Sequence, residues 1–312
     1  MQKLLVSLTV ILFFSCSEPK EIIKSPHLQQ HCYCEGEGKY TLVLDAGMGN
    51  WSLFYQPLFQ KLKVNNKVCL IDRPGYNMDT VTTLPRDLVT VATELNDILI
   101  KQGILSNVIL VGHSLGGLHV RMYQSMFPDK VMGLVLLDAA HSEQFTRLPM
   151  EFYDIMKNQP QQLDKVIQIA QKGYLKYGKG KIPTFGLPEN LLNQYYAVAT
   201  QPEYYYSMKL EVEYFEDNLK KAVALTQLND LPLLVIGSKN SMDKTILPIK
   251  SKDYPYIEHN KIWFELQKDL SRLSSNSTFI TSKENHYLNV TDPELVYAAM
   301  TNWLSKNFSY EK

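Results

Sequence analysis

Short apolar runs alternate with longer amphipathic segments along most of the chain. Six runs have the length and the β-branched or aliphatic character of strands, and they span residues 40–45, 68–72, 107–111, 131–137, 231–237 and 277–281. Helical patterns lie between them, at 53–62, 84–102, 115–126, 257–273 and 293–307. This alternation predicts an α/β fold class, with a mostly parallel sheet and helices on both faces.

The segment 139–230 interrupts the alternation. It contains no convincing strand, part of it (203–228) has a helical pattern, and it carries two tyrosine clusters, Tyr195-Tyr196 and Tyr204-Tyr205-Tyr206. A helical insertion between two strands would lie over the carboxyl ends of the sheet, where α/β proteins bind ligands. We therefore expect a helical cap at 141–230 on a core formed by 28–140 and 231–312. Most of the tyrosines should pack within the cap, and a few should line the mouth of a pocket.

The N-terminus differs from the rest of the chain. Lys3 precedes an apolar run, 4–14, which is too short to span a bilayer but fits the hydrophobic region of a secretory signal. Phe14-Ser15-Cys16 then resembles a bacterial lipobox, and this resemblance implies cleavage before Cys16 and acylation of its thiol and new amino group. We expect a signal peptide at 1–15, a tether at 16–27 and an exported, lipid-anchored protein of the bacterial cell envelope. The alternative is a plain secretory signal and a soluble periplasmic or secreted product.

Composition and charge are those of an ordinary globular protein. The chain has 312 residues, 45% of them hydrophobic, and 32 basic residues balance 32 acidic ones, so no basic surplus indicates nucleic-acid binding. Beyond Cys16 there are three cysteines, an odd number that leaves at least one free thiol in an exported protein. Cys32 and Cys34 are two residues apart, which allows only a strained disulfide or half a metal site, and Cys69 is expected to be a small core residue. No redox role and no metal ion is expected.

Gly112-His113-Ser114-Leu115-Gly116 lies between the predicted strand 107–111 and the predicted helix 115–126. A G-x-S-x-G at such a junction is the pattern of a nucleophile elbow, a tight turn that holds the serine hydroxyl above a helix N-terminus. Glycines two residues before and two after the serine keep side chains away from the neighbouring strand and helix. Ser114 is therefore the predicted nucleophile.

A serine hydroxyl becomes a useful nucleophile only when a base removes its proton. His286 follows the last predicted strand and precedes the final helix, a context that the other six histidines do not share, and it is the predicted base. The tetrahedral intermediate also needs backbone N–H donors for its oxyanion. The predicted donors are Leu115, which follows the nucleophile, and Met48, which lies in the glycine-containing loop 46–50 after the first strand.

Five segments of the chain occur in a characteristic order, and they are Asp45-Ala46-Gly47-Met48-Gly49, Ile71-Asp72-Arg73-Pro74-Gly75-Tyr76, Gly112-His113-Ser114-Leu115-Gly116-Gly117, Leu136-Leu137-Asp138-Ala139-Ala140 and Asn285-His286. Together they resemble the α/β-hydrolase superfamily, with the cap placed as in its lipase- and esterase-like members, over about residues 28 to 312. The resemblance implies the α/β-hydrolase fold, a Ser-His-acid triad and no metal or organic cofactor. It also implies a structural role for the turn at 72–75, so Asp72 and Arg73 are expected to brace the strand ends.

The triad acid is where this sequence departs from the family pattern. The family usually places an aspartate about three residues after a strand-closing glycine, and here that position after Gly237 holds Asn240, with Asp243 three residues further on. Some relatives, such as haloalkane-dehalogenase-like enzymes, carry the acid after the earlier strand, and here Asp138 follows the run 131–137. Asp138 and Asp243 remain alternatives, and Asp138 is preferred.

These residues indicate an exported serine hydrolase that cleaves a carboxylic ester of a small to medium, partly apolar molecule through an acyl-enzyme on Ser114. One alternative is an amide or thioester hydrolase, or a lyase, on the same site; another is a non-catalytic ligand-binding lipoprotein. Dehalogenation is disfavoured, because it uses an aspartate nucleophile where Ser114 stands. The expected partners are a small ester-like molecule and, through the lipid anchor, a membrane, and the sequence carries no signal for an oligomeric state.

Overall fold

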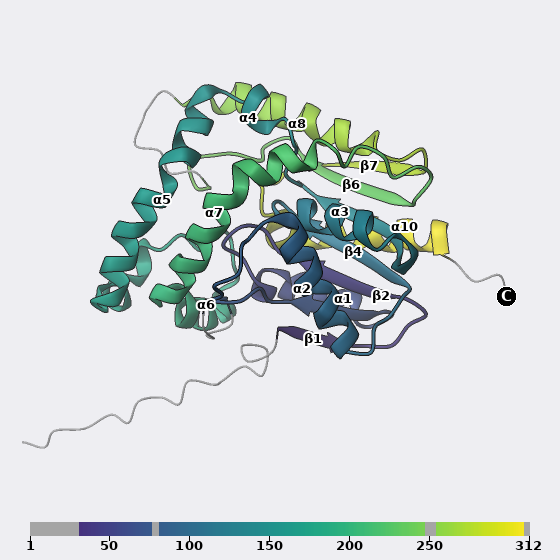
Figure 1. Cartoon of the computed structure of the whole chain (residues 1–312), viewed down its shortest axis with the longest axis horizontal. Helices are drawn as coiled ribbons and strands as arrows, with labels where there is room; N and C mark the ends of the chain where they lie inside the picture. The colour runs from purple at the N-terminus through teal and green to yellow at the C-terminus, as the bar shows by residue number, and fades with distance from the viewer. Residues whose placement is uncertain (1–30, 77–80, 247–253, 309–312) are drawn as a thin grey trace, which may run out of the picture.

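The computed structural model describes residues 31–76, 81–246 and 254–308 (Figure 1). Within them seven strands form one sheet, in the order β1-β3-β2-β4-β5-β6-β7, with β1 antiparallel to β3 and all other neighbours parallel. The strands are β1 (Cys32–Glu35), β2 (Thr41–Asp45), β3 (Lys67–Ile71), β4 (Val108–His113), β5 (Val131–Leu137), β6 (Leu233–Ser238) and β7 (Ser277–Ser282). The predicted mostly parallel sheet is confirmed, and β1 adds an antiparallel edge strand that the pattern analysis missed.

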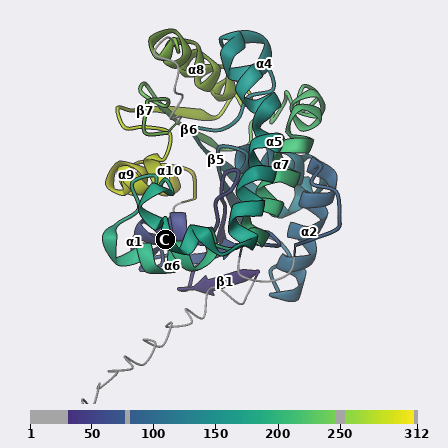
Figure 2. The ribbon, with the colours of Figure 1, turned by 90° about the vertical axis from the view of Figure 1, so that its left-hand side faces the viewer.

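Helices cover both faces of this sheet. One face carries α1 (Gln56–Leu62), α9 (Leu288–Thr291) and α10 (Pro293–Phe308), and the other carries α2 (Leu88–Lys101), α3 (Gly116–Met126) and α8 (Tyr256–Ser271). Figure 2 shows α1 and α10 on one side and α2 on the other. Side chains alternate along a strand, so Val43 of β2 packs in one core while its neighbours Leu42 and Leu44 pack in the other. The α/β fold class predicted from the sequence is therefore confirmed.

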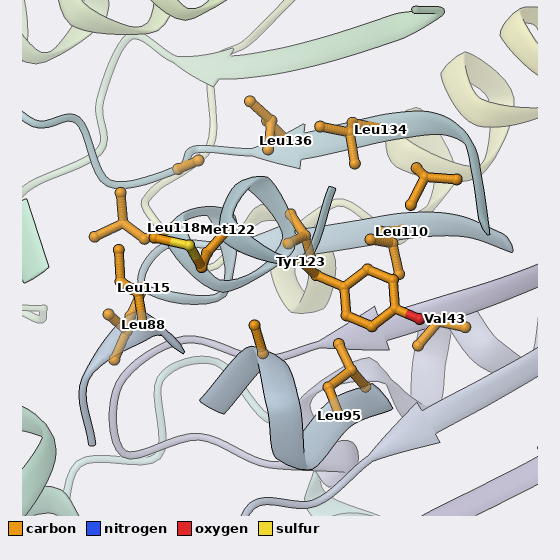
Figure 3. Packing of buried hydrophobic residues seen from close by; sticks show 14 of the residues in the cluster. Val43, Leu88, Leu95, Leu110, Leu115, Leu118, Met122, Tyr123, Leu134 and Leu136 are labelled. Carbon is orange, nitrogen blue, oxygen red and sulfur yellow. The ribbon is translucent and has the colours of Figure 1, made fainter. Parts of the chain in front are cut away.

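The core between the sheet and α2 and α3 holds the nucleophile turn in place. The first eight residues of α3, from Gly116 to Tyr123, are all buried. Figure 3 shows Leu118, Met122 and Tyr123 of this helix packed with apolar side chains of α2, β2, β4 and β5, among them Leu95, Val43, Leu110, Leu134 and Leu136. A helix buried along its length is fixed in position by packing, so the turn that precedes it is fixed as well.

The segment between β5 and β6 is helical. It contains α4 (Gln144–Arg147), α5 (Met150–Gln171), α6 (Leu192–Ala199) and α7 (Pro202–Ala222), with short 3-10 turns at Tyr174–Tyr177, Lys179–Lys181 and Glu189–Leu191. Figure 1 shows α5, α6 and α7 at one end of the strands, and in Figure 2 they lie in front of the sheet. This is the place expected for the cap.

One predicted helix begins later than the pattern indicated. The predicted helix 84–102 begins at Leu88, because the Asp87 side chain caps it by accepting hydrogen bonds from the backbone N–H groups of Val89 and Thr90. The cap at Asp87 therefore sets the start of the helix. Leu84, whose apolar side chain suggested an earlier start, lies before the helix and is exposed.

The expectation for Cys69 is wrong in one respect, because Cys69 forms a disulfide with Cys34. The antiparallel register of β1 and β3 pairs these two residues directly, and the pairing was invisible from the sequence because β1 itself was not recognised. Cys32 remains a buried thiol, and burial, followed by the charge of Asp72, raises its pKa to about 12.

The predicted signal peptide, Cys16 and the tether lie within residues 1–30, outside the described residues. Among the helices that the structure describes, none combines the length and the apolar character that crossing a bilayer requires.

Candidate active site

Ser114 lies in the turn between β4 and α3, and its backbone φ is +51°. A left-handed φ is unfavourable for a residue with a side chain, and it persists at functional sites where the surrounding structure enforces it. The enforcing bonds come from the end of β5, where Ser114 N donates to Leu137 O at 3.2 Å and Ser114 O accepts from Ala140 N at 2.9 Å. The serine side chain stays half-buried at the edge of a pocket. This is the geometry expected of a nucleophile elbow.

The two glycines of the elbow are required by contacts between backbones. A Cβ atom on Gly112 would lie 2.5 Å from Gly116 O, and a Cβ atom on Gly116 would lie 2.4 Å from Asp45 O. Both distances are below 3.0 Å, which Cβ atoms essentially never show, so neither position accepts a larger residue without moving β2, β4 or α3.

Gly116→Ala is therefore expected to destabilise the protein by about 3 kcal/mol or more, at the upper end of overpacking effects, because backbone atoms must move to make room. Thermal unfolding measures the effect. Gly180→Ala is the matched control, since a Cβ atom there meets nothing within 4 Å. Equal melting temperatures for the two variants would contradict the prediction.

His286 lies in the loop after β7, and Asp138 directly follows β5. Nδ1 of His286 is 2.7 Å from Oδ2 of Asp138, whose side chain is fully buried, while 13% of the histidine side chain is exposed. With Nδ1–H donating to the carboxylate, Nε2 is left as the basic nitrogen. Ser114 and His286 line the same pocket, so the structure brings the predicted nucleophile and base together.

Three donors hold the Asp138 carboxylate. Besides His286, the backbone N–H of Ser238 donates to Oδ1 at 2.9 Å, and the Ser241 hydroxyl donates to Oδ2 at 2.5 Å. The backbone of Asp138 has a φ of +42°, a second left-handed residue at the site. A buried carboxylate is tolerated when its oxygens are bonded in this way.

Asp243 lies elsewhere. Its Oδ1 accepts hydrogen bonds from Thr245 N at 2.7 Å, Thr245 Oγ1 at 2.6 Å and Ile246 N at 3.1 Å, which makes it the first residue of a tight turn. No hydrogen bond among the described residues joins it to His286. Asp243 is therefore a turn residue, and of the two alternatives only Asp138 is hydrogen-bonded to His286 among the described residues.

Met48 and Leu115, the predicted oxyanion donors, line the pocket beside Ser114. Gly47 packs directly against the nucleophile, since a Cβ atom on it would lie 3.0 Å from Ser114 Cβ. Among the hydrogen bonds of the described residues, the backbone N–H groups of Met48 and Leu115 have no protein acceptor. Both donors are therefore available to an oxygen atom of a ligand.

Two further histidines flank His286 and are neutral. Burial, followed by the charge of His286, lowers the pKa of His113 to about 3 and that of His259 to about 4. Nε2 of His113 lies 2.9 Å from His286 O, and the hydroxyl of Tyr254 lies 2.6 Å from Nδ1 of His259. These histidines support the loop and the packing around His286.

The pocket at Ser114 has a volume of about 210 Å³ and lies between core and cap. Its lining is mostly sulfur-containing, aromatic and aliphatic, and it includes Met48, Met156, Met208, Met242, Phe152, Phe185, Phe215, Trp263 and Ile246. Tyr204 and Tyr287 are the tyrosines of this lining, whereas Tyr195 packs between cap and core, stacked on Trp51. No aspartate, glutamate, lysine or arginine is among its described lining residues.

Sequence reasoning missed two residues whose hydrogen bonds hold Asp138 and its neighbour in place, Ser241 and Gln267. Gln267 lies in α8 and pins the residue after Asp138, because its side chain accepts from Ala139 N at 3.0 Å and donates to Ala139 O at 2.8 Å. The sequence signal that could have identified Gln267 is its position among the buried residues on one face of α8. The only signal for Ser241 was its place beside Asn240, where the family usually carries the acid.

One group of possible metal ligands occurs among the described residues, namely Cys32, Cys34 and Cys69. The disulfide uses two of these three sulfur atoms. A single remaining thiol is too few ligands for a structural metal site.

Comparison with known proteins agrees with this architecture. A family model described as alpha/beta hydrolase fold matches residues 40–171. Protein YbdG of Bacillus subtilis is 21% identical over 97% of this chain and 94% of its own length. The 2-hydroxy-6-oxononadienedioate/2-hydroxy-6-oxononatrienedioate hydrolase of Comamonas testosteroni is 29% identical over 39% of this chain and 44% of that enzyme.

Solved structures share the fold over most of the chain. An esterase from Thermogutta terrifontis superposes with a TM-score of 0.62 at 18% identity, covering 88% of this chain and 92% of that one. The haloalkane dehalogenase DatA from Agrobacterium tumefaciens gives 0.66 at 17% identity, over 88% and 92%. The chain therefore has the α/β-hydrolase fold, and part of it, residues 40–171, matches the model of that family.

Proposed function

We propose that the chain is a serine hydrolase that cleaves carboxylic esters with an apolar acyl group. The observation that carries this proposal is the meeting of three elements in one pocket: the hydroxyl of Ser114, two backbone N–H groups without a protein acceptor, and an imidazole whose Nδ1 is bonded to a buried carboxylate. A nucleophile, a base with its orienting acid and an oxyanion site are the parts that acyl transfer requires.

The proposed reaction uses these parts in two steps. His286 Nε2 takes the Ser114 proton as the oxygen attacks the ester carbonyl, and the N–H groups of Met48 and Leu115 stabilise the oxyanion that forms. His286 then protonates the departing alcohol, which leaves an acyl-enzyme. Water attacks this acyl group with His286 as base, and Ser114 is released with the carboxylic acid. Asp138 stabilises the imidazolium in both steps.

The lining of the pocket supports an apolar, uncharged acyl group. Its four methionines, Met48, Met156, Met208 and Met242, are flexible and adapt to irregular apolar shapes. A carboxylate or ammonium group on the substrate would lose its hydration there without gaining an ionic partner among the described lining residues.

Chromogenic esters of increasing acyl length test this proposal. We expect kcat/KM to rise from acetyl onward, by up to about fourfold per methylene buried, and to fall once the chain exceeds the 210 Å³ cavity. The hemisuccinate ester is the matched control for the butanoyl ester, since it exchanges a terminal methyl for a carboxylate, and it should be a much poorer substrate. The anilide and the thioester with the same acyl group show whether the enzyme prefers an ester, an amide or a thioester bond. Absence of turnover with every ester, together with absence of labelling by a fluorophosphonate, would contradict the proposal.

The proposed location is the bacterial cell envelope, with the enzyme held by lipid on Cys16. The support is the apolar run that ends at Phe14-Ser15-Cys16. Mass spectrometry of the mature N-terminus is expected to show an acylated Cys16 as the first residue. Cys16→Ser should shift the protein from the membrane fraction, because acyl chains supply the apolar area that anchors it. A mature chain that begins elsewhere, or an unmodified Cys16, would refute the anchor.

A further inference from the structure

A buried ion pair joins the core to the cap at the loop that carries Met48. Arg73 follows β3 and Glu211 lies in α7; Nε of Arg73 donates to Oε1 of Glu211 at 2.6 Å, and the two side chains are only 4% and 3% exposed. Arg73 Nη1 also donates to Oδ1 of Asp45 at 2.6 Å. The role expected for Arg73 was to brace the strand ends. That role accounts for its bond to Asp45 but does not explain its bonds to Glu211 and to the loop that carries Met48.

The remaining bonds hold the backbone on both sides of Met48. Nη2 of Arg73 donates to Gly47 O at 2.6 Å, and Oε2 of Glu211 accepts from Gly49 N at 3.1 Å. The same Oε2 accepts from the Tyr76 hydroxyl at 2.8 Å. Every oxygen of the cap carboxylate is therefore bonded, and one of its bonds goes directly to the loop.

Arg73 and the backbone N–H of Asn50, which donates to Gly47 O at 3.1 Å, together orient the peptide that carries the N–H of Met48. Gly47 O and the N–H of Met48 belong to one planar peptide, and in a trans peptide the C=O and the N–H point in opposite directions. With its carbonyl turned toward the buried guanidinium, this peptide turns its N–H away from Arg73. Met48 lines the pocket beside Ser114 and its N–H has no protein acceptor. A carbonyl bonded to a cation is also polarised, which strengthens the N–H of the same peptide as a donor.

The charges of this cluster persist despite burial. Burial alone would raise the pKa of Asp45, but Arg73 and His119 outweigh it and bring that pKa to about 2. Burial alone would lower the pKa of Arg73, but Glu211 and Asp45 outweigh it and raise that pKa above its usual value. Arg73 and Asp45 are therefore charged in the neutral range, and the positive charge on Arg73 strengthens the hydrogen bonds that it donates to the loop.

We propose that Arg73 and Glu211 are positioning residues that orient the Met48 N–H toward the oxyanion. This pair, the Arg73–Glu211 clamp, rests on the proposed function, because an oxyanion donor acts only when Ser114 attacks a carbonyl. The clamp stabilises the transition state and contributes little to binding of the ester itself. Because Glu211 belongs to α7, a competent oxyanion site requires the cap helix to be in place.

Glu211→Gln tests the clamp with little change of shape. The amide has one acceptor where the carboxylate has two, so its NH₂ group must face either Arg73 Nε–H or the donors from Gly49 and Tyr76. We expect kcat to fall about 10- to 100-fold, less than the 10²–10³ that follows complete loss of an oxyanion donor. KM should stay within about threefold, because substrate binding precedes formation of the oxyanion. The rate of fluorophosphonate labelling, which also places an oxygen in this site, should fall with kcat.

Glu94→Gln is the matched control. Glu94 is the acid of another ion pair with a buried arginine, Arg86, at 2.8 Å, and it borders the same small void as Arg73. Its carboxylate bonds Arg86, away from the loop at Met48. Glu94→Gln should keep kcat and the labelling rate within about twofold of the wild-type values, whatever its effect on the melting temperature.

The outcomes separate this inference from the proposed function. Wild-type protein that neither turns over esters nor reacts with the probe would overturn both. If the wild type is active and a folded Glu211→Gln variant has the same kcat and labelling rate as Glu94→Gln, the clamp alone is overturned.

If Glu211→Gln does not fold, Tyr76→Phe tests the clamp instead, since it removes one hydrogen bond from Glu211. A folded Tyr76→Phe with kcat reduced about threefold or more at constant KM supports the clamp, and unchanged kcat overturns it.

Discussion

Ser114→Ala is expected to lower kcat for ester hydrolysis by about 10⁶-fold, the scale of loss seen when the nucleophile of a serine hydrolase is removed. In the proposed reaction the hydroxyl oxygen is the one atom of the site that forms a bond to the substrate, so no neighbouring group replaces it. The fold should be unaffected, because alanine needs less room and has the same backbone requirements at the left-handed φ of +51°. Steady-state kinetics and fluorophosphonate labelling, followed by mass spectrometry, measure the loss.

Ser207→Ala is the control for this experiment. Ser207 is also buried, and its hydroxyl has no hydrogen-bond partner among the described residues, so the change removes the same atom away from the nucleophile. It should retain activity and labelling. Labelling of Ser114→Ala at the wild-type rate would show that another residue is the nucleophile.

Asp138→Asn is expected to lower kcat by about 10⁴-fold, the cost of presenting the wrong partner to the imidazole. The Ser238 N–H and the Ser241 hydroxyl both donate toward the carboxylate, so no orientation of an amide satisfies all three donors. If the amide oxygen faces Ser238, the NH₂ group faces Nδ1 of His286 and selects the tautomer in which Nε2 carries the proton. That tautomer cannot accept the proton of Ser114.

Asp243→Asn is the matched control for the acid. Its Oδ1 serves a local turn at Thr245 and Ile246, and an asparagine oxygen accepts the same hydrogen bonds. We expect kcat within about threefold of the wild-type value. A larger loss in Asp243→Asn than in Asp138→Asn would return Asp138 to a structural role. Little effect of either change would indicate a Ser-His dyad oriented by Ser241 or water.

The elements of the site converge because every one of them follows the carboxyl end of a parallel strand. The loop that carries Met48 follows β2, Ser114 follows β4, Asp138 follows β5, Ser241 follows β6 and His286 follows β7. Neighbouring parallel strands end at the same edge of a sheet, so loops that are distant in sequence meet there. The same geometry places Glu211 of the inserted cap against the first of these loops.

Features that depend on neighbours in sequence could be predicted from the sequence alone. Apolar runs defined the parallel strands to within two residues at each end, and the clearest runs belong to β2, β4 and β6, whose side chains are buried along the whole strand because the sheet is covered on both faces. The elbow at Ser114 was recognised from a spacing of glycines that its backbone contacts require. The position of His286 after the last strand followed from the order of elements, which is also a property of the linear chain.

Tertiary structure alone decided which partners these residues have. Asp138 and Asp243 are both aspartates that follow a strand, and only their hydrogen-bond partners in the folded chain distinguish them: His286 for Asp138, and the turn at Thr245 for Asp243. The disulfide depends on the register of an antiparallel edge strand too short and too polar to be recognised, and the clamp joins two residues 138 positions apart. Local patterns report which side chains are buried, whereas pairing is set by how the loops of different strands approach one another in space, and that information appears in no single segment of the chain.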